Sequence, residues 1–507
     1  MIAEDHVAGV VLFRKNVVSP SQVAALTASL QAIARAAGAP PLWMSIDHEG
    51  GMVTRFPSAP AGTGPVMTTL PSAMALGATG DPALARRAGD VAGRELRTLG
   101  IHLNFAPVLD VNNNPGNPVI GARAFAEAPA LVEALGVAYI EGLQASGVAA
   151  TAKHFPGHGD VTVDSHLGLP RVEHDLSRLE AVELAPFAAA ARAEVAAVMT
   201  AHIVYPRLDP SGVPATMSMP ILTDLLRDRL RFRGFVISDS LSMRAIVDHF
   251  GVGEAAVAAI QAGCDVVLAL GPEGLQREVL EHLAGAIESG AIPAERVAAA
   301  TAGLAAAATR WKVAATQAKG PAGTTDLPAL VGAADHQAVA RHIAEAAVTL
   351  VRDQRRIVPL QGPRIGVVIV ADDSANGAGA ESLHLVESLQ RCGADARACA
   401  PHDDLSLVDQ VVALTYSRGM LAPARVAAIQ DLHRRVDDRL VVVAAGDPYD
   451  LMQFPQVSAY LVTYGADPFS LDAAARVLLG TLTPKGRLPV SLPGLHPVGT
   501  GSVGGAR

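Results

Sequence analysis

The chain has 507 residues, of which 50% are hydrophobic and 18% are charged. This length is too great for one ordinary hydrophobic core, so we expect two domains or one large barrel with an appended domain, and the composition excludes a disordered or fibrous chain. The formal net charge of −9 and the pI of about 6.0 offer no basic surface for a phosphate backbone, so nucleic acid is not an expected partner.

Two further features bear on location. No apolar run reaches the length of about 18 residues that a membrane span needs, so no membrane span is predicted. Residues 1–13 lack the basic stretch and cleavage site of an export signal, so we expect a cytoplasmic protein, although an upstream start could add a signal.

Cys264, Cys392 and Cys399 are too few and too scattered for a disulfide framework, and we expect buried thiols.

Short apolar strands alternate with Ala- and Leu-rich stretches of helical period through the first 312 residues. This alternation predicts parallel βα units, and we expect an α/β fold with a TIM-type (β/α)8 catalytic barrel over residues 1–312. A closed barrel has eight strands, and the first is missing here because residues 1–7 leave no room for it. The expected strands are Gly9–Phe13, Leu42–Asp47, His102–Val108, Ala149–Phe155, Ala196–Ile203, Gly234–Asp239 and Asp265–Leu270.

A second α/β domain is expected in the last third of the chain. Residues 313–336 are rich in Ala, Gly, Thr and Pro and predict a linker. Residues 337–507 resume the alternation of strands and helices, which predicts a doubly wound or sandwich-like α/β domain. Its expected strands are Val348–Val351, Arg364–Val370, Val408–Leu414, Arg439–Ala444, Ala459–Tyr464 and Leu488–Leu492.

Polar side chains stand where five of the expected barrel strands end. One such residue alone is most simply a polar cap of its strand. In a parallel barrel, however, the carboxyl ends of the strands form one rim that carries the active site, so five polar ends together predict a site there. These ends are Asp47-His48-Glu49-Gly50-Gly51, Asp110, Lys153-His154, His202 and Ser238-Asp239.

The segment from Lys153 to His166, KHFPGHGDVTVDSH, is the densest in candidate groups. Its Gly and Pro content predicts a loop over the barrel mouth. Asp164 and His166 stand two residues apart, so the carboxylate can hydrogen-bond one imidazole nitrogen while the other exchanges a proton with a substrate. From the residues alone, an ordinary loop hydrogen bond and a metal site stay open as alternatives.

This segment resembles the signature of the bacterial β-N-acetylglucosaminidases of glycoside hydrolase family 3. The resemblance covers nearly the whole chain, because the second half, which ends in GRLPVSLPG, is similar to the family's C-terminal domain. Further motifs occur in the family's order: IDHEGGMVTR (Ile46–Arg55), FAPVLDVN (Phe105–Asn112), NPVIGARAF (Asn117–Phe125), MTAHIVYP (Met199–Pro206) and GFVISDSLSM (Gly234–Met243).

The resemblance implies a retaining exo-β-N-acetylglucosaminidase in which Asp239 is the nucleophile and forms a covalent glycosyl-enzyme. It also implies that His166, oriented by Asp164, protonates the leaving oxygen and then deprotonates the incoming water. A histidine becomes neutral when it gives up its proton, so an anionic acceptor such as phosphate meets less repulsion, and phosphorolysis stays open beside hydrolysis. No cofactor and no metal are implied.

The resemblance further implies a set of residues that grip the sugar. In this set a carboxylate accepts from ring hydroxyls while cationic groups donate, and such bonds reject analogues that lack the matching group. The set consists of Asp47, Arg55, Arg123, Lys153 and His154. Functional and capping roles are both open for Asp110, His158 and His202, and Glu49 is expected to order its own Gly-rich loop.

The expected partner is a small carbohydrate with a terminal N-acetylglucosamine, either an oligosaccharide or a muropeptide, and the resemblance favours a role in cell-wall recycling. His48 and Met52 depart from residues common in the family, so the accepted aglycone is expected to differ. The sequence does not indicate an oligomeric state. Alternatives are a β-glucosidase or phosphorylase of the same family, a non-catalytic sugar-binding protein, and a metal-dependent barrel hydrolase that uses His154, His158, Asp160, Asp164, His166 and His202.

Overall fold

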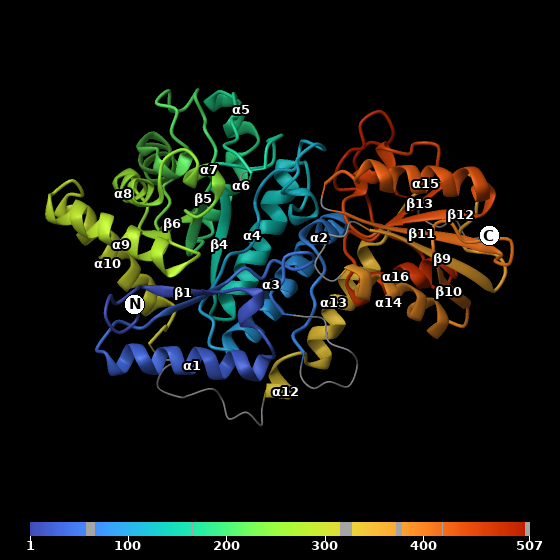
Figure 1. The fold of residues 1–507 in the computed structure, drawn as a ribbon, viewed down its shortest axis with the longest axis horizontal. Helices are drawn as coiled ribbons and strands as arrows, with labels where there is room; N and C mark the ends of the chain where they lie inside the picture. Colours follow the sequence, from blue (N-terminus) through green and yellow to red (C-terminus); the bar gives the residue numbers. More distant parts are fainter. Residues whose placement is uncertain (57–65, 165–166, 315–326, 372–377, 418, 502–507) are drawn as a thin grey trace.

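The computed structural model of the chain describes every residue except 57–65, 165–166, 315–326, 372–377, 418 and 502–507. Two α/β units lie side by side, each built on its own sheet (Figure 1). The first unit holds the N-terminus and strands β1 to β7, and the second holds β8 to β13. The predicted fold class is therefore confirmed, while the domain boundaries at residues 312 and 337 stay predictions.

Seven parallel strands form the first sheet, and each pairs with the next along the sequence. Large side chains such as Trp43, Phe105, Phe235 and Ile237 form one buried cluster on the curled sheet. The expected strand His102–Val108 is reduced to two residues. The strands are β1 (Gly9–Leu12), β2 (Trp43–Ile46), β3 (Leu103–Asn104), β4 (Ala149–Phe155), β5 (Ala197–Thr200), β6 (Phe235–Ser240) and β7 (Val266–Leu268).

Helices connect these strands, and local sequence explains where several begin. The Ser19 hydroxyl accepts a hydrogen bond from the Gln22 amide at the start of α1, a common helix N-cap. Prolines occupy the first position of α1, α3 and α4, where a missing N–H is harmless. The helices are α1 (Pro20–Ala36), α2 (Ala73–Thr79), α3 (Pro82–Thr98), α4 (Pro129–Ala145), α5 (Leu176–Ala181), α6 (Leu184–Arg192), α7 (Arg244–Val247), α8 (Val252–Ala262), α9 (Glu273–Glu288) and α10 (Ala294–Arg310).

The two edge strands of the first sheet, β1 and β7, do not pair with each other in the described part of the chain. A hollow of about 440 Å³ lies between them, lined mainly by apolar side chains of both edges, such as Val10, Val11, Val267 and Leu268. Seven strands were expected from the sequence, and the described residues form a sheet of seven.

The second sheet has the strand order β10-β9-β11-β12-β13-β8, parallel except for the antiparallel pair of β13 with β8. Helices α13, α14 and α16 cover one face and α15 covers the other (Figure 1), which confirms the expected doubly wound, sandwich-like α/β domain. The elements are β8 (Thr349–Asp353), β9 (Arg364–Ala371), β10 (Asp395–Cys399), β11 (Gln410–Tyr416), β12 (Leu440–Ala444), β13 (Ala459–Val462), α12 (Leu327–Leu330), α13 (Ala334–Ala347), α14 (Ala378–Arg391), α15 (Pro423–Val436) and α16 (Pro468–Leu478).

Two sequence-based expectations fail in the described residues, and the bounds of the linker stay a prediction. Leu488–Leu492 forms no strand, since Pro489 and the nearby Pro493 offer no N–H to a ladder. Cys264 is buried and Cys399 is half-buried, but Cys392 is exposed, so the expectation of three buried thiols is wrong. The predicted linker includes α12 and the start of α13, while its residues 315–326 lie outside the described part of the chain. No described helix is long and apolar enough to cross a membrane.

The two units share a continuous hydrophobic core. Met74 and Phe125 of the first unit belong to the same buried cluster as Ile343 and Leu488 of the second. Helix α2 packs against α13, and polar contacts flank this core. The Ser72 hydroxyl donates to the Tyr464 carbonyl at 2.7 Å, and Glu127 accepts from the Ser491 amide and hydroxyl at 2.7 and 2.8 Å. The second unit is therefore fixed against the first.

Candidate active site

The polar ends of β2, β4 and β6 meet on one rim of the curled sheet. Asp47 follows β2, and its Oδ1 lies 3.0 Å from the Nζ of Lys153 in β4. The charge of the same lysine, together with those of His154 and His202, acts on Asp239 near the end of β6. The residues that the sequence placed at separate strand ends thus lie within electrostatic reach of one another.

Glu49 is the centre of the charged network on this rim. Its Oε1 lies 2.6 Å from Lys153 Nζ, and its two oxygens accept from the Nε and Nη2 of Arg123 at 2.9 Å each. Such a two-bond contact between a guanidinium and a carboxylate is strong and fixes both groups. Only 5% of the Glu49 side chain and 2% of the Lys153 side chain are exposed. The expectation that Glu49 orders its own loop is therefore wrong for its side chain.

The turn that brings Glu49 inward depends on the glycines that follow it. Gly50 has a φ of +94°, a conformation that favours glycine, and a Cβ there would lie 2.7 Å from the Pro71 carbonyl oxygen. The backbone after β2 can consequently fold back closely against the start of α2.

All three groups of this network are charged at neutral pH. Burial raises the pKa of Glu49, but the charges of Arg123 and Lys153 outweigh it and hold that pKa well below its ordinary value. Burial lowers the pKa of Arg123 and of Lys153, yet the neighbouring Glu49 and Asp47 carboxylates raise both overall. Paired in this way, the charges can stay buried at the rim.

Asp47 and Arg55 form the more open part of the network. Asp47 Oδ2 accepts from Arg55 Nη2 at 2.9 Å, and the two side chains are 21% and 24% exposed. The Arg55 guanidinium also lies over the Phe13 ring, 5.7 Å from its centre, in a cation–π contact. These two side chains can reach a bound molecule while the buried network holds them in place.

Asp110, which follows β3, orients two histidines at the end of β4. Its Oδ2 lies 2.7 Å from His154 Nδ1, and its Oδ1 accepts from the backbone amides of His154 and His158 at 3.1 and 2.7 Å. An ionised carboxylate accepts from a protonated Nδ1, so the other nitrogen of His154, Nε2, is left for other partners. Burial, followed by the charge of His154, lowers the pKa of His158 to about 4, so His158 is neutral near pH 7.

Asp239 lies half-buried near the end of β6, and its Oδ1 accepts from the Ser240 amide at 2.7 Å. Burial raises its pKa, but the charges of His202 and His154 and this amide lower it overall, which favours the carboxylate form. His202 braces the same strand end: its Nε2 lies 3.0 Å from the Ser240 carbonyl oxygen and its Nδ1 lies 2.8 Å from Thr216 Oγ1. The geometry thus favours a bracing role for His202.

The loop after β4 carries the remaining candidates. Asp164 is half-buried, and its carbonyl oxygen accepts from the amides of Leu167 and Gly168 at 2.9 and 3.0 Å. His166 lies outside the described residues, so its role stays a prediction.

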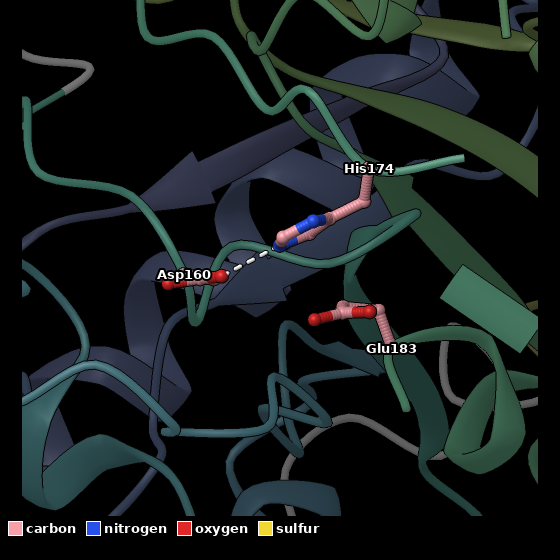
Figure 2. A group of neighbouring side chains, drawn as sticks. All are labelled: Asp160, His174 and Glu183. Atoms are coloured by element: carbon pink, nitrogen blue, oxygen red, sulfur yellow. Dashed lines mark hydrogen bonds and ion pairs between the residues drawn. The ribbon is translucent and has the colours of Figure 1, made fainter. Parts of the chain in front are cut away.

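One group at the base of this loop could hold a metal ion by residue type and spacing, and it is the only such group among the described residues. Ligand atoms of Asp160, His174 and Glu183 lie within 4.8 Å of one another (Figure 2). These atoms are already engaged, because His174 Nε2 lies 2.7 Å from Asp160 and Glu183 pairs with Arg178 at 2.6 Å. A guanidinium beside the carboxylate disfavours a cation there, and the contact of Asp160 with His174 instead ties the two ends of the loop together.

Three comparisons with known proteins bear on this site. The family model described as Glycosyl hydrolase family 3 N terminal domain matches residues 1–306. Beta-hexosaminidase A of Pseudoalteromonas piscicida is 31% identical over 562 residues, which cover 97% of this chain and 90% of that protein. A Beta-hexosaminidase of Xylella fastidiosa (strain M23) is 40% identical over 290 residues, or 56% of this chain and 82% of that protein.

Among solved structures, the chain resembles a glycoside hydrolase family 3 beta-N-acetylglucosaminidase from Paenibacillus sp. str. FPU-7. The two are 37% identical and superpose with a TM-score of 0.87, over 97% of this chain and 94% of that one. The similarity therefore extends through both α/β units.

Proposed function

The chain belongs to glycosyl hydrolase family 3, and from that premise we propose that it is a retaining exo-β-N-acetylglucosaminidase that releases terminal β-linked N-acetylglucosamine. Similarity over nearly the full length to proteins named Beta-hexosaminidase A and beta-N-acetylglucosaminidase supports this choice of sugar. The observation that carries the proposal is the buried, charge-paired rim around Asp47, Glu49 and Lys153, close to an ionised Asp239.

We assign sugar binding to Asp47, Arg55, Arg123, Lys153 and His154. Asp47 and Arg55 are partly exposed and offer an acceptor and a donor to ring hydroxyls. The Glu49 network holds Arg123 and Lys153 in fixed positions, so a sugar meets donors that are already oriented. Hydrogen bonds from such fixed groups select for a substrate with matching hydroxyl and acetamido groups.

Catalysis then follows two displacement steps. In the first, an oxygen of Asp239 attacks C1, the bond from C1 to the leaving oxygen breaks, and His166 gives its proton to that oxygen. In the second, water attacks C1, a proton passes from water to His166, and the ester bond to Asp239 breaks. Each step inverts C1, so the released sugar keeps its β configuration. Asp164 would orient the His166 ring and raise its basicity.

For the natural substrate, we propose a fragment of the cell wall. A terminal N-acetylglucosamine occurs in muropeptides and in other oligosaccharides, and the motif resemblance favours cell-wall fragments and their recycling. A histidine acid/base also leaves phosphate open as an acceptor, because neutral imidazole repels an anion less than a carboxylate does.

The proposal is tested with paired chromogenic substrates and the purified chain. We expect release of 4-nitrophenol from its N-acetyl-β-glucosaminide at least about 100 times faster than from its β-glucoside, with the β anomer formed first in an NMR time course. A faster rate on the β-glucoside would assign a β-glucosidase, and equal rates would contradict selection for the acetamido group. A sugar phosphate formed in phosphate buffer would assign a phosphorylase, and loss of activity in EDTA would assign a metal-dependent hydrolase.

A further inference from the structure

The proposed sugar-binding residue Arg123 lies on a short connecting segment that has no place in either sheet. Residues 117–123 lie within the connection from β3 to α4 and end in the 3-10 turn η2 (Gly121–Arg123). Asn117 ties the first half of this segment to the β4 loop: its Nδ2 donates to the carbonyls of His158 and Gly159 at 2.8 and 2.9 Å, and its Oδ1 accepts from the amides of Val119 and Ile120 at 2.9 Å.

The second half of the segment is held from the other α/β unit. Asp447 precedes the 3-10 turn η6 (Pro448–Met452) after β12, and it is only 1% exposed. Its Oδ1 accepts from the Ala122 amide at 2.5 Å, and its Oδ2 accepts from the Gly419 amide at 2.9 Å. A buried carboxylate with two amide donors makes strong, charge-assisted hydrogen bonds.

The fit of this carboxylate against the segment is close. Gly121 has a φ of +45°, and a Cβ there would lie 2.3 Å from both oxygens of Asp447. Only glycine allows the carboxylate to approach the backbone so closely at this conformation. Asp447 thus fixes the residue immediately before Arg123, whose guanidinium must meet both Glu49 oxygens at 2.9 Å.

A neighbouring residue of the same turn reaches the other side of the rim. The Tyr449 hydroxyl accepts from Asn112 Nδ2 at 2.9 Å, and Asn112 is two residues beyond Asp110, which orients His154. Asp447 therefore contacts the backbone beside Arg123, and Tyr449 contacts a side chain of the segment that carries Asp110.

We propose that Asp447 is a positioning residue, which sets the place of Arg123 through the backbone of Gly121 and Ala122, so that the second α/β unit contributes to sugar binding without touching the sugar. Only the expected change in kinetics rests on the proposed function. The broad shared core and the contacts of Ser72 and Glu127 hold the units together independently, so the loss of one carboxylate acts locally.

A double-mutant cycle between Asp447→Asn and Arg123→Ala tests the proposal, with 4-nitrophenyl N-acetyl-β-glucosaminide as the probe. In the wild-type background we expect Asp447→Asn to lower kcat/KM about tenfold, mainly through KM, because Arg123 is no longer held for binding. In the Arg123→Ala background the same change should lower kcat/KM less than twofold, since the residue it positions is gone. Equal losses in both backgrounds, or no loss in either, would overturn the positioning role.

A control and a second variant separate positioning from general damage. Asp467→Asn removes another buried carboxylate of the second unit, whose bonds go to Ser470 within the first turn of α16. We expect it to affect kcat/KM equally in both backgrounds. Gly121→Ala pushes a methyl group against the Asp447 carboxylate and should reproduce the KM effect if Asp447→Asn does not fold.

Hydrogen–deuterium exchange gives a readout that does not need activity. We expect the peptide with Ala122 to exchange faster in Asp447→Asn than in wild type, while Asp467→Asn leaves it unchanged. A wild-type chain without activity on the probe would contradict the proposed function, whereas an unchanged exchange rate at Ala122 would contradict the role of Asp447 itself.

Discussion

Single residues at the rim pair the buried charges of Glu49, Arg123 and Lys153 with one another. Arg123 and Lys153 face Glu49, and Asp47 faces both Lys153 and Arg55. Taking ions out of water is costly, and only close pairing with good hydrogen bonds offsets the cost. The same pairs that stabilise the charges therefore also fix the groups that we propose as donors to the sugar.

Glu49→Gln tests this pairing. The change leaves two buried cations with one fewer anion, and breaking such a network costs about 3 kcal/mol or more. We expect a loss of that order in the free energy of unfolding in urea, together with a fall in kcat/KM of roughly 100-fold as Arg123 and Lys153 lose their fixed positions. Glu141→Gln removes an exposed partner of Arg86 and is the control. Stability equal to wild type would show that Glu49 is not the centre of the network.

A pH dependence of stability follows from three buried histidines. Burial lowers the pKa of His48 and of His158 to about 4, and that of His102 to about 3. The unfolded chain binds these protons near pH 6.5 and the folded chain does not, so stability is lost as the pH falls from about 6.5 towards 4. His336, whose pKa is raised mainly by its bond to Glu95, acts in the opposite direction.

His102→Gln isolates one of these contributions. Between pH 7 and pH 5 the variant should lose about 2 kcal/mol less than wild type, measured by urea unfolding at both values. His6→Gln at an exposed position is the control. Identical pH slopes for wild type and His102→Gln would mean that His102 gains its proton as readily in the folded chain as in the unfolded one.

At the level of helices and strands, close packing of α3 against α4 supports the strand ends that carry the rim. Glycines allow the approach: a Cβ at Gly89 would lie 2.2 Å from the Tyr139 carbonyl oxygen, and one at Gly142 would lie 2.0 Å from that of Arg86. Both neighbours are backbone atoms and cannot rotate away, so the two helices must separate to admit any side chain.

Two glycine-to-alanine changes in helices should accordingly have opposite signs. Gly142→Ala should lower the free energy of unfolding by about 2 kcal/mol through overpacking. Gly285→Ala, on the exposed face of α9 with nothing within 4 Å, should raise it by about 0.5 to 1 kcal/mol, because alanine favours helix. The measurement is urea unfolding of both variants beside wild type. A stabilising Gly142→Ala would contradict the described contact of the two helices.

The sequence predicted most strands of both sheets, because buried parallel strands are continuous apolar runs bounded by turns. It missed β10, whose residues Asp395–Cys399 are mostly exposed at a sheet edge and show no such run. It also did not predict that Glu49 is the centre of the charged network. Nothing in DHEGG indicates that the partners of Glu49 are Arg123 and Lys153, about 74 and 104 residues away. Contacts of that range depend on how the strands are arranged, and the local pattern does not contain them.

Across the whole chain, the two α/β units form one body with a shared core. The alternation of strands and helices predicted two units, and the motif resemblance extended over both. Neither indicated that residues such as Asp447 would reach the backbone beside Arg123, because the sequence does not show which surfaces meet. The contact of the second unit with the backbone beside Arg123 could therefore be found only from the three-dimensional structure.

A shared core predicts that the units unfold together. We expect a single calorimetric transition that Gly285→Ala in the first unit raises and Asp467→Ala, which removes the N-cap of α16 in the second, lowers, each moving the whole transition. Two transitions, with each variant moving only one, would show that the interface does not couple the units.

The proposed mechanism requires that Asp239 become esterified to C1 of N-acetylglucosamine. Reaction with a slow, fluorinated N-acetylglucosaminyl substrate, followed by intact-mass and peptide mass spectrometry, detects such an ester. We predict a mass increase of one sugar on the peptide that contains Asp239, and no such increase in Asp239→Asn. Turnover of the probe without any adduct, or an adduct on a different residue, would show that Asp239 is not the nucleophile.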